Sequence, residues 1–412
     1  MMEPKIRFKG FEGEWKETKY SSFATIRRGL TYSPENIVSK GIRVLRSSNI
    51  DEDVFLRSEE DVFVHSSCIN IPFAKDGDIL ITAANGSPRL VGKHAVINKL
   101  NGDKVVPGGF MILASSKEPY FLNSCMGAPW YKTFLKTGVA GGNGAIGNLN
   151  KHALEEYEFY TPSNKLERDG LASYFTSLDS QISAVTSRLA SLKQMKAASL
   201  QAMFPQEGET VPKIRFKRFE GDWKKVKLNS FAKRVTRKNS HLESTLALTI
   251  ASAHGLVSQI DYFNNLVVGS NIRNYYLLKR GEFAYNKSYS NGYPFGSVKR
   301  LDRYEQGILS TLYITFSIDN SISSDYLTHF FDTNLWHKEV AERAAEGARN
   351  HGLLNIGAND FLDINIWKPE SKAEQQAIAS YFSSLDRQIS LQSQRLEKLK
   401  QIKSACLDKM FV

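Results

Sequence analysis

Residues 173–204 read SYFTSLDSQISAVTSRLASLKQMKAASLQAMF, and residues 380–411 read SYFSSLDRQISLQSQRLEKLKQIKSACLDKMF. The two stretches are identical at 19 of 32 positions and lie 207 residues apart. In the first stretch, apolar residues recur at steps of four and three: Leu178, Ile182, Val185, Leu189 and Leu192. This 3.5-residue repeat lets helices pack side by side, so two long, paired helices are predicted. The alternative, one helix of a globular core, is less favoured because the other faces carry Ser, Gln, Lys and Arg.

A second repeat opens each half of the chain. Residues 4–16 read PKIRFKGFEGEWK and residues 212–224 read PKIRFKRFEGDWK, 208 residues apart. Because both repeats have nearly the same spacing, the whole chain is interpreted as a tandem duplication. The opening element is predicted to be a Lys/Arg-rich, strand-like stretch ending at Trp15 or Trp223. The polar segment FPQEGETVP (204–212), with two prolines, is predicted to link the halves.

The intervening stretches, residues 25–160 and 233–368, differ in sequence but share a skeleton. Both contain short β-like runs bounded by Gly, Asn and Pro. Gly77-Asp78-Ile79 and Gly281-Glu282-Phe283 have comparable intervals to a later glycine, Gly92 or Gly296. This pattern predicts a retained scaffold whose loops diverged because each half reads something different.

Composition narrows the class of protein. The chain has 412 residues, 42% of them hydrophobic, which predicts two to four domains. The net charge of +11 favours an anionic partner, nucleic acid first, over a basic but uncommitted surface. Three cysteines without CxxC spacing are typical of a reducing cytoplasm. The mixed charges of the N-terminus and the lack of a long apolar run predict a soluble cytoplasmic protein.

Catalytic and cofactor motifs are missing from the sequence. It has no HExxH, GxSxG or P-loop, and its His and Cys residues lack metal-ligand spacing. The Gly-rich stretch 140–147 is interpreted as a loop. Asn70-Ile71-Pro72-Phe73 lacks one proline of the tetrapeptide found in adenine methyltransferases. We therefore predict a non-catalytic chain that binds no cofactor and no metal.

Taken together, the repeated motifs carry a family resemblance over essentially all 412 residues. The carriers are the W-K opening of each half, the strand-then-proline exits TPSNKLERDGLASYFTSLDSQIS and KPESKAEQQAIASYFSSLDRQIS, and the endings LKQMKAASLQAMF and LKQIKSACLDKMF. The chain resembles the specificity (S) subunit of type I restriction–modification systems. The first copy departs from the pattern at LERDG (166–170), where Gly170 predicts a frayed helix start.

The resemblance implies an α+β fold with a pseudo-twofold tandem repeat. Two target-recognition domains built on short β-strands are separated by two long antiparallel helices, a coiled-coil spacer. The expected boundaries are residues 1–163 for the first recognition domain, 164–204 for the first helical region, 205–211 for the linker, 212–370 for the second recognition domain and 371–412 for the second helical region.

The resemblance also implies function and partners. Each recognition domain would read one half of a bipartite, asymmetric site in double-stranded DNA. The chain would dock two methyltransferase (M) subunits, which use S-adenosylmethionine. Motor–nuclease (R) subunits, which use ATP and Mg²⁺, would complete the complex. The alternatives are a stand-alone adenine methyltransferase with fused recognition domains and a coiled-coil adaptor without DNA contact.

Candidate DNA-binding residues are chosen from polar loops whose side chains can donate to bases and phosphates. In the first half they are Arg46, Ser47, Ser48, Asn49, Asn85, Ser87, Arg89 and Lys93. In the second half they are Lys287, Tyr289, Ser290, Asn291 and Tyr293. Two residues in Gly-containing loops, Asn143 and Arg349, are predicted to extend the surface. For each residue, the alternative is an ordinary polar hairpin.

The helices are predicted to act as a ruler between the two readers. The antiparallel seam would bring one set of four residues, Leu178, Ile182, Leu189 and Leu192, to face another, Leu385, Ile389, Leu396 and Leu399. The exposed faces, with Arg188, Lys193, Arg395 and Lys400, would remain for methyltransferase subunits or solvent. A helix of about 33 residues rises roughly 50 Å, enough to hold two readers about one turn of DNA apart.

Overall fold

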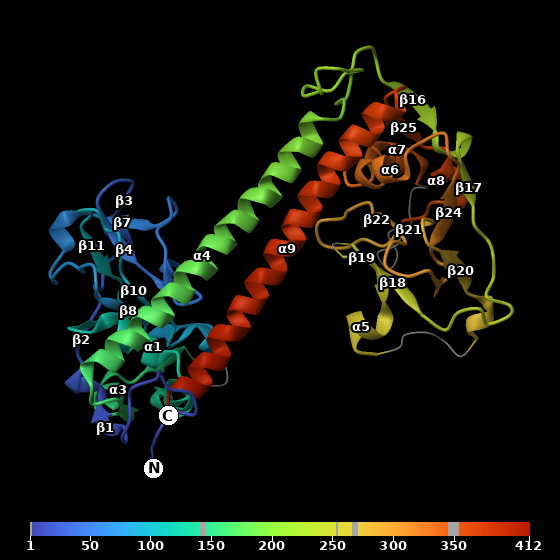
Figure 1. Ribbon diagram of the computed structural model, residues 1–412. Coiled ribbons are helices and arrows are strands. Elements are labelled where there is room, and N and C mark those ends of the chain that lie inside the picture. Colours follow the sequence, from blue (N-terminus) through green and yellow to red (C-terminus); the bar gives the residue numbers. More distant parts are fainter. Residues whose placement is uncertain (1, 141–145, 253, 266–270, 345–353) are drawn as a thin grey trace. The chain divides into compact units, whose positions relative to one another are not determined.

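The computed structural model describes residues 2–140, 146–252, 254–265, 271–344 and 354–412 (Figure 1). The chain forms two compact units. The first unit comprises Met1–Leu189 and Gln392–Val412, and the second comprises Ala190–Leu391. The long helices α4 (Lys165–Ala202) and α9 (Lys372–Met410) each begin in one unit and end in the other. The predicted domain ranges, which keep each helix whole, stay a prediction.

A four-stranded antiparallel sheet forms the scaffold of the first unit. Its strand order is β10 (His94–Val96), β8 (Ile79–Thr82), β12 (Met111–Ser116), β2 (Ala24–Arg28). The apolar run ILIT of β8 is fully buried because Leu80 packs in one apolar cluster with Leu45 and Ile50, while Ile79 and Ile81 pack in the core that contains the helices. Helices α1 (Pro119–Met126), α2 (Pro129–Gly138) and α3 (Lys151–Glu155) complete this core.

Shorter strands build the remainder of the first unit. A second sheet has the order β11 (Val105–Pro107), β4 (Ile42–Leu45), β7 (Val62–Val64), β3 (Ile37–Val38). Smaller ladders are β13 (Val139–Ala140) with β14 (Gly147–Leu149) and β9 (Ala84–Asn85), β5 (Ile50–Asp51) with β6 (Val54–Phe55), and β1 (Lys16–Lys19) with β15 (Glu158–Thr161).

The second unit repeats the scaffold sheet. Its order is β22 (Ser297–Arg300), β21 (Phe283–Asn286), β24 (Ile314–Ile318), β17 (Ala232–Arg234), which matches β10-β8-β12-β2 strand for strand. Two-stranded ladders are β18 (Leu248–Ala251) with β19 (Gly255–Ser258), β20 (Tyr276–Lys279) with β23 (Gln306–Leu309), and β16 (Lys224–Lys227) with β25 (Asn365–Lys368). The short helices are α5 (Gln259–Phe263), α6 (Ser324–Phe330), α7 (His337–Arg343) and α8 (Ala358–Leu362).

The two long helices contact each other within each unit. In the first unit, the Tyr174 hydroxyl of α4 lies 3.2 Å from the Cys406 sulfur of α9, and this hydrogen bond raises the pKa of Tyr174 to about 12. In the second unit, the Ser199 and Tyr381 hydroxyls lie 3.0 Å apart. Residue numbers rise along one helix as they fall along the other, so the helices are antiparallel. The predicted α+β fold with long antiparallel helices is confirmed.

Burial along the helices follows the predicted apolar pattern in part. Leu178, Ile182, Leu192 and Leu385 are buried. The other four seam residues are half-buried: Leu189, Ile389, Leu396 and Leu399. In the first unit, Leu178 and Leu399 belong to one apolar cluster, and in the second unit Leu192 packs with Leu385 and Ile389. The residue-by-residue facing of the whole seam stays a prediction.

The sequence predicts a strand-like stretch at the opening of each half. The structure has no strand there among the residues that it describes. Described residues before Lys16 form irregular structure with turns, and the strand begins only after Trp15. Gly13 and Gly221 lie 208 residues apart, and both have positive φ, 86° and 81°. Such φ values favour glycine and interrupt a strand, which explains the difference.

The opening arginine of each half clamps the start of a long helix. Arg7 donates to both carboxylate oxygens of Glu167 on α4, at 2.7 and 2.9 Å, and also to the Gly13 carbonyl at 2.7 Å. Arg215 makes the same contacts with Glu374 on α9, at 2.7 and 2.8 Å, and with Gly221. Both glutamates are 1% exposed. The repeated opening motif is therefore a turn that presents an arginine to a buried carboxylate.

Helix α4 runs without a break through Gly170, so the predicted fraying of its start is wrong. A Cβ at Gly170 would lie 3.6 Å from the Phe8 ring, in ordinary contact distance. Clamping by Arg7 nearby and packing of Phe8 on this turn offset the low helix propensity of glycine. Within the described part of the chain, no helix is long and apolar enough to cross a bilayer.

Candidate nucleic-acid interface

A short turn after β4 carries the first group of predicted DNA-binding residues. Arg46 and Ser48 are exposed and Ser47 is half-buried. Asn49 is 1% exposed, and its side chain accepts from the Arg46 backbone N–H at 2.7 Å and donates to the Leu56 carbonyl at 3.0 Å. Asn49 therefore holds the shape of the turn in this structure, and its contact with DNA stays a prediction.

The structure brings two of the predicted loops together. The Asn85 amide donates to the Ser47 hydroxyl at 3.2 Å, although the residues are 38 positions apart. Arg46, Ser47 and Asn85 line a cleft of about 390 Å³, together with Tyr32 and Phe110. The Asn85 side-chain oxygen also accepts from the Ser87 backbone at 2.9 Å, which fixes the amide orientation. This cleft offers an arginine and an amide beside aromatic surface, the groups that read base edges.

An apolar residue of this cleft was missed from the sequence. Phe110 is 65% exposed just before β12. Ala114 pairs with Ile79, and Phe316 pairs with Phe283 in the second unit. Counting back four residues from Ala114 and from Phe316 gives Phe110 and Leu312, and Leu312 is also 63% exposed. Exposed apolar side chains at matching positions suit contact with thymine methyl groups; the sequence signal was an apolar residue directly after Gly108-Gly109.

Arg89 and Lys93 lie away from that cleft. They line a separate cleft of about 420 Å³ in the first unit, whose other lining residues include His94, Lys400 and Lys403. Arg89 is exposed and Lys93 is half-buried. Five of the predicted first-half residues therefore divide between two clefts: Arg46, Ser47 and Asn85 line one, and Arg89 and Lys93 line the other.

The second-unit loop after β21 ends in a tight turn. The Tyr293 backbone N–H donates to the Ser290 carbonyl at 2.8 Å, and Gly292 has φ 79°. This turn leaves Asn291 exposed and Tyr293 half-buried, while Tyr289 is 64% exposed. Lys287 is turned to the protein, because its ammonium donates to the Ile356 carbonyl at 3.4 Å. Asn143 and Arg349 lie outside the described residues.

Comparison with known proteins was made at the level of sequence and of structure. Neither a protein-family model nor a curated protein matches this chain. A solved structure does match: the crystal structure of the type I restriction–modification system S subunit from M. genitalium, with a TM-score of 0.64 over 100% of this chain and 99% of that chain, at 13% identity. The fold is that of a type I restriction–modification S subunit.

Two further solved structures align over most of the chain. One is the HsdS subunit from Thermoanaerobacter tengcongensis, with 13% identity, 96% coverage of both chains and a TM-score of 0.38. The other comes from work on complex assembly and conformational transition of the type I R-M system, with 13% identity, coverage of 96% of this chain and 97% of that chain, and a TM-score of 0.46.

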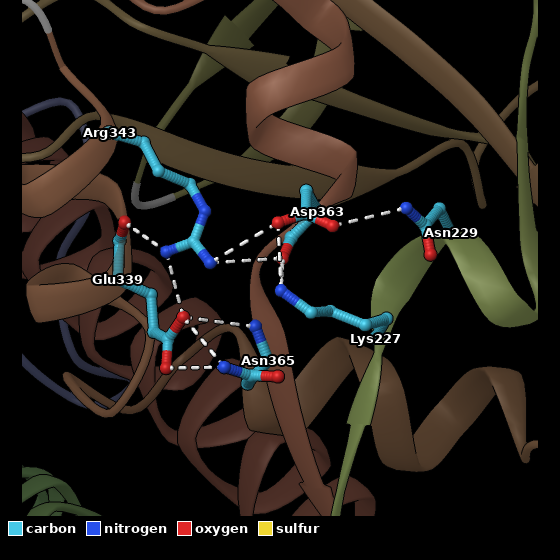
Figure 2. Close-up of polar contacts among 6 residues, drawn as sticks. All are labelled: Lys227, Asn229, Glu339, Arg343, Asp363 and Asn365. Atoms are coloured by element: carbon cyan, nitrogen blue, oxygen red, sulfur yellow. Dashed lines mark hydrogen bonds and ion pairs between the residues drawn. The ribbon is translucent and has the colours of Figure 1, made fainter.

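In the second unit of this S-subunit fold, a polar network anchors the end of α7 (Figure 2). Asp363 accepts from Lys227 at 2.7 Å and from Arg343 at 3.4 Å. Arg343 also donates to Glu339, whose carboxylate accepts from Asn365 at 2.9 Å. The hydrogen bond from Lys227 lowers the pKa of Asp363. The network ties α7 to strands β16 and β25 immediately before residues 345–353, the segment that contains Arg349.

A second charged cluster of the S-subunit fold lies between α4, α6 and α9 in the second unit. His329, Asp332 and Asp386 offer ligand atoms within 4.8 Å of one another, a spacing that a metal ion could use. However, the Lys196 ammonium lies 2.9 Å from Asp332 and 2.7 Å from Asp386, and Lys299 lies 2.9 Å from Asp332. Two lysines therefore already supply the positive charge, which makes the cluster an ion-pair site.

This ion-pair site predicts an acid-sensitive stability. Burial would raise the pKa of Asp332, but Lys299, His329 and Lys196 together hold it far below its usual range. A carboxylate whose pKa is lower in the folded chain than in the unfolded chain stabilises the fold at pH values above its unfolded-state pKa, which is near 4. This stabilisation is lost as the pH falls further. Below about pH 4, the loss should approach about 1.4 kcal/mol per pH unit.

The test of this acid sensitivity compares unfolding free energies between pH 7 and pH 3. Asp332→Asn should show a shallower decline with falling pH than the unsubstituted chain. The exposed Asp261→Asn of the same unit should decline as the unsubstituted chain does. Equal slopes for Asp332→Asn and the unsubstituted chain would contradict the proposed role of Asp332.

Proposed function

We propose that this chain is the DNA-specificity subunit of a type I restriction–modification complex. Each unit would read one half of a bipartite, asymmetric target in double-stranded DNA. The observation that carries the proposal is the scaffold sheet, which has the same strand order in both units but bears unlike loops. A repeated scaffold with different loops suits two readers with different half-sites. The S-subunit fold over the whole chain supports the same role.

Charge supports DNA as the ligand. The net charge is +11, and Arg46 and Arg89 are exposed on the loops of the first unit. Counterion release from DNA by lysines and arginines supplies affinity, while base-edge contacts supply specificity. A gel shift of target DNA that weakens steeply with salt is the expected result. The proposal would be refuted if the complex with methyltransferase subunits methylated no DNA motif, or if it did not bind DNA that carries the motif at low salt.

Repeat-equivalent surface on the helices supports docking of two methyltransferase subunits. Met195 of α4 and Ile402 of α9 are 207 residues apart, and they are 50% and 37% exposed. Exposed apolar side chains at equivalent positions suit two identical partners. Those partners would bring S-adenosylmethionine, and the motor–nuclease subunits would bring ATP and Mg²⁺. In this proposal the chain itself recognises DNA and assembles the complex without performing the chemistry.

Substitution of a loop residue should weaken one half-site only. Arg89→Ala and Asn291→Ala should each cost about 1–3 kcal/mol of discrimination at one half of the target. The measurement is the methylated motif of the assembled complex, together with affinity for DNA altered in one half-site at a time. Arg188→Ala, on an exposed helix position, serves as the control. If both loop variants keep the original affinity and motif, the readers lie elsewhere.

A further inference from the structure

Two clefts of the protein are lined by the same repeat positions of the long helices. The first, in the first unit, measures about 420 Å³, and α9 lines it with Lys400, Lys403, Ser404 and Leu407. The second, in the second unit, measures about 310 Å³, and α4 lines it with Lys193, Lys196, Ala197 and Leu200. Each of these four pairs is 207 residues apart. The antiparallel partner helix adds Ile182 to the first cleft and Ile389 to the second, also 207 apart. We call these two sites the spacer clefts.

The predicted reading loop forms the opposite wall of each spacer cleft. In the first cleft this wall includes Arg89, Gly92 and Lys93. In the second it includes Tyr293 and Gly296. The two glycines have positive φ, 86° and 74°, and hold the same place in the scaffold sheet, before β10 and before β22. Each spacer cleft therefore lies between a long helix and the loop that is proposed to read bases in the same unit.

The floor of each cleft is neutralised, but its rim is basic. Lys403 lies 2.8 Å from Asp53 and 2.7 Å from Asp179, just as Lys196 lies against Asp332 and Asp386. The lining of the first cleft contains five lysines and arginines against two carboxylates, and that of the second three lysines against one. Lys193 is exposed at the rim, and Lys400 lies 2.6 Å from Glu52 with 36% of its side chain exposed. A surplus of cations at an open rim attracts an anionic ligand.

We propose that the spacer clefts hold the DNA sugar–phosphate backbone beside each half-site, with Lys193 and Lys400 contacting phosphates. This inference rests on the proposed function. A duplex whose bases meet the reading loop has its backbone next to that loop, where the cleft lies. The two strands of a duplex are equivalent, so two equivalent clefts suit one strand each. The long helices would then contribute to DNA affinity as well as to spacing.

The test uses the complete complex with its methyltransferase subunits and measures target-DNA affinity against salt concentration. Lys193→Gln and Lys400→Gln should each reduce the slope of log affinity against log salt by about 0.9, the value of one phosphate contact. The methylated motif should not change, because phosphate contacts carry no base information. Arg188→Gln and Arg395→Gln are matched controls: both are exposed, 207 residues apart on the same helices, and absent from both clefts. These controls should keep the original slope.

Two outcomes would overturn the inference. Slopes equal to the original in both lysine variants would remove the clefts from the DNA interface. Reduced recovery of methyltransferase subunits with unchanged slopes would show that the clefts bind a carboxylate-bearing partner protein. Neither outcome touches the proposed function, which fails only if the unsubstituted complex does not bind its methylated motif.

Discussion

Arg215→Met is expected to destabilise the second unit by about 3 kcal/mol, within the range for breaking a buried ion pair. The change leaves the Glu374 carboxylate, 1% exposed, without the two hydrogen bonds that it accepts from the guanidinium. The Gly221 and Glu220 carbonyls lose their donor at the same time. Urea unfolding, followed by circular dichroism, measures the loss. Arg7→Met should have the same effect on the first unit through Glu167.

The double variant Arg215→Met, Glu374→Met separates the ion pair from the shape of the site. Replacing both partners by apolar residues removes the unpaired buried charge, so most of the stability should return. Lys217→Met, an exposed position two residues away, is the control and should cost little. A single variant as stable as the original chain would show that the clamp contributes nothing to folding.

A four-residue insertion into both long helices is expected to change the spacing of the DNA target and leave both half-sites intact. The insertion points are Leu189/Ala190 and Leu391/Gln392, where the units divide. Four residues lengthen a helix by about 6 Å and nearly restore its phase, which corresponds to about two base pairs. The original target should therefore lose binding almost completely, while a target with a longer unspecified spacer gains it.

The readout for the spacing is the methylated motif of the active insertion variant, obtained by methylome sequencing. A seven-residue insertion restores the 3.5-residue register and should move the motif by about three base pairs. Insertion of two residues rotates the following part of each helix by about 200°, so that its apolar residues no longer face the other helix. This variant is the control and is expected not to fold. An active variant with an unchanged spacer would exclude the ruler.

Local pattern was sufficient to predict the long helices and to mark equivalent short strands in the two halves, but not the order of the scaffold sheet. Apolar steps of four and three continue for several turns in the first copy, and the second copy keeps most of the same positions, so no tertiary contact is needed to recognise the helices. The matching intervals from Gly77 and Gly281 to later glycines marked the same strands in both halves, β8 and β21. These features repeat within short windows of sequence, where periodicity is informative.

Contacts between distant residues could not be predicted in this way. Arg7 was read as part of a basic strand because nothing near it in sequence shows Glu167, 160 positions later. The polarity of Asn49 predicts contact with DNA, and nothing near it in sequence shows that its amide donates to the Leu56 carbonyl inside the turn. Phe110 was overlooked because an exposed phenylalanine looks the same in sequence as a buried one. Burial and pairing are tertiary properties, and polarity alone does not fix them.

The division of the chain between the units has a consequence during synthesis on the ribosome. The second unit is one continuous segment, Ala190–Leu391, whereas the first unit joins two segments that the second separates in the chain. The first unit needs Gln392–Val412, which emerges roughly 10 to 40 s after Leu189 at usual elongation rates. Until then, the apolar surface later covered by Leu407, Met410 and Phe411 stays open to water. The first half to be made is therefore the last to be finished, and nascent chains are most prone to aggregation in that interval.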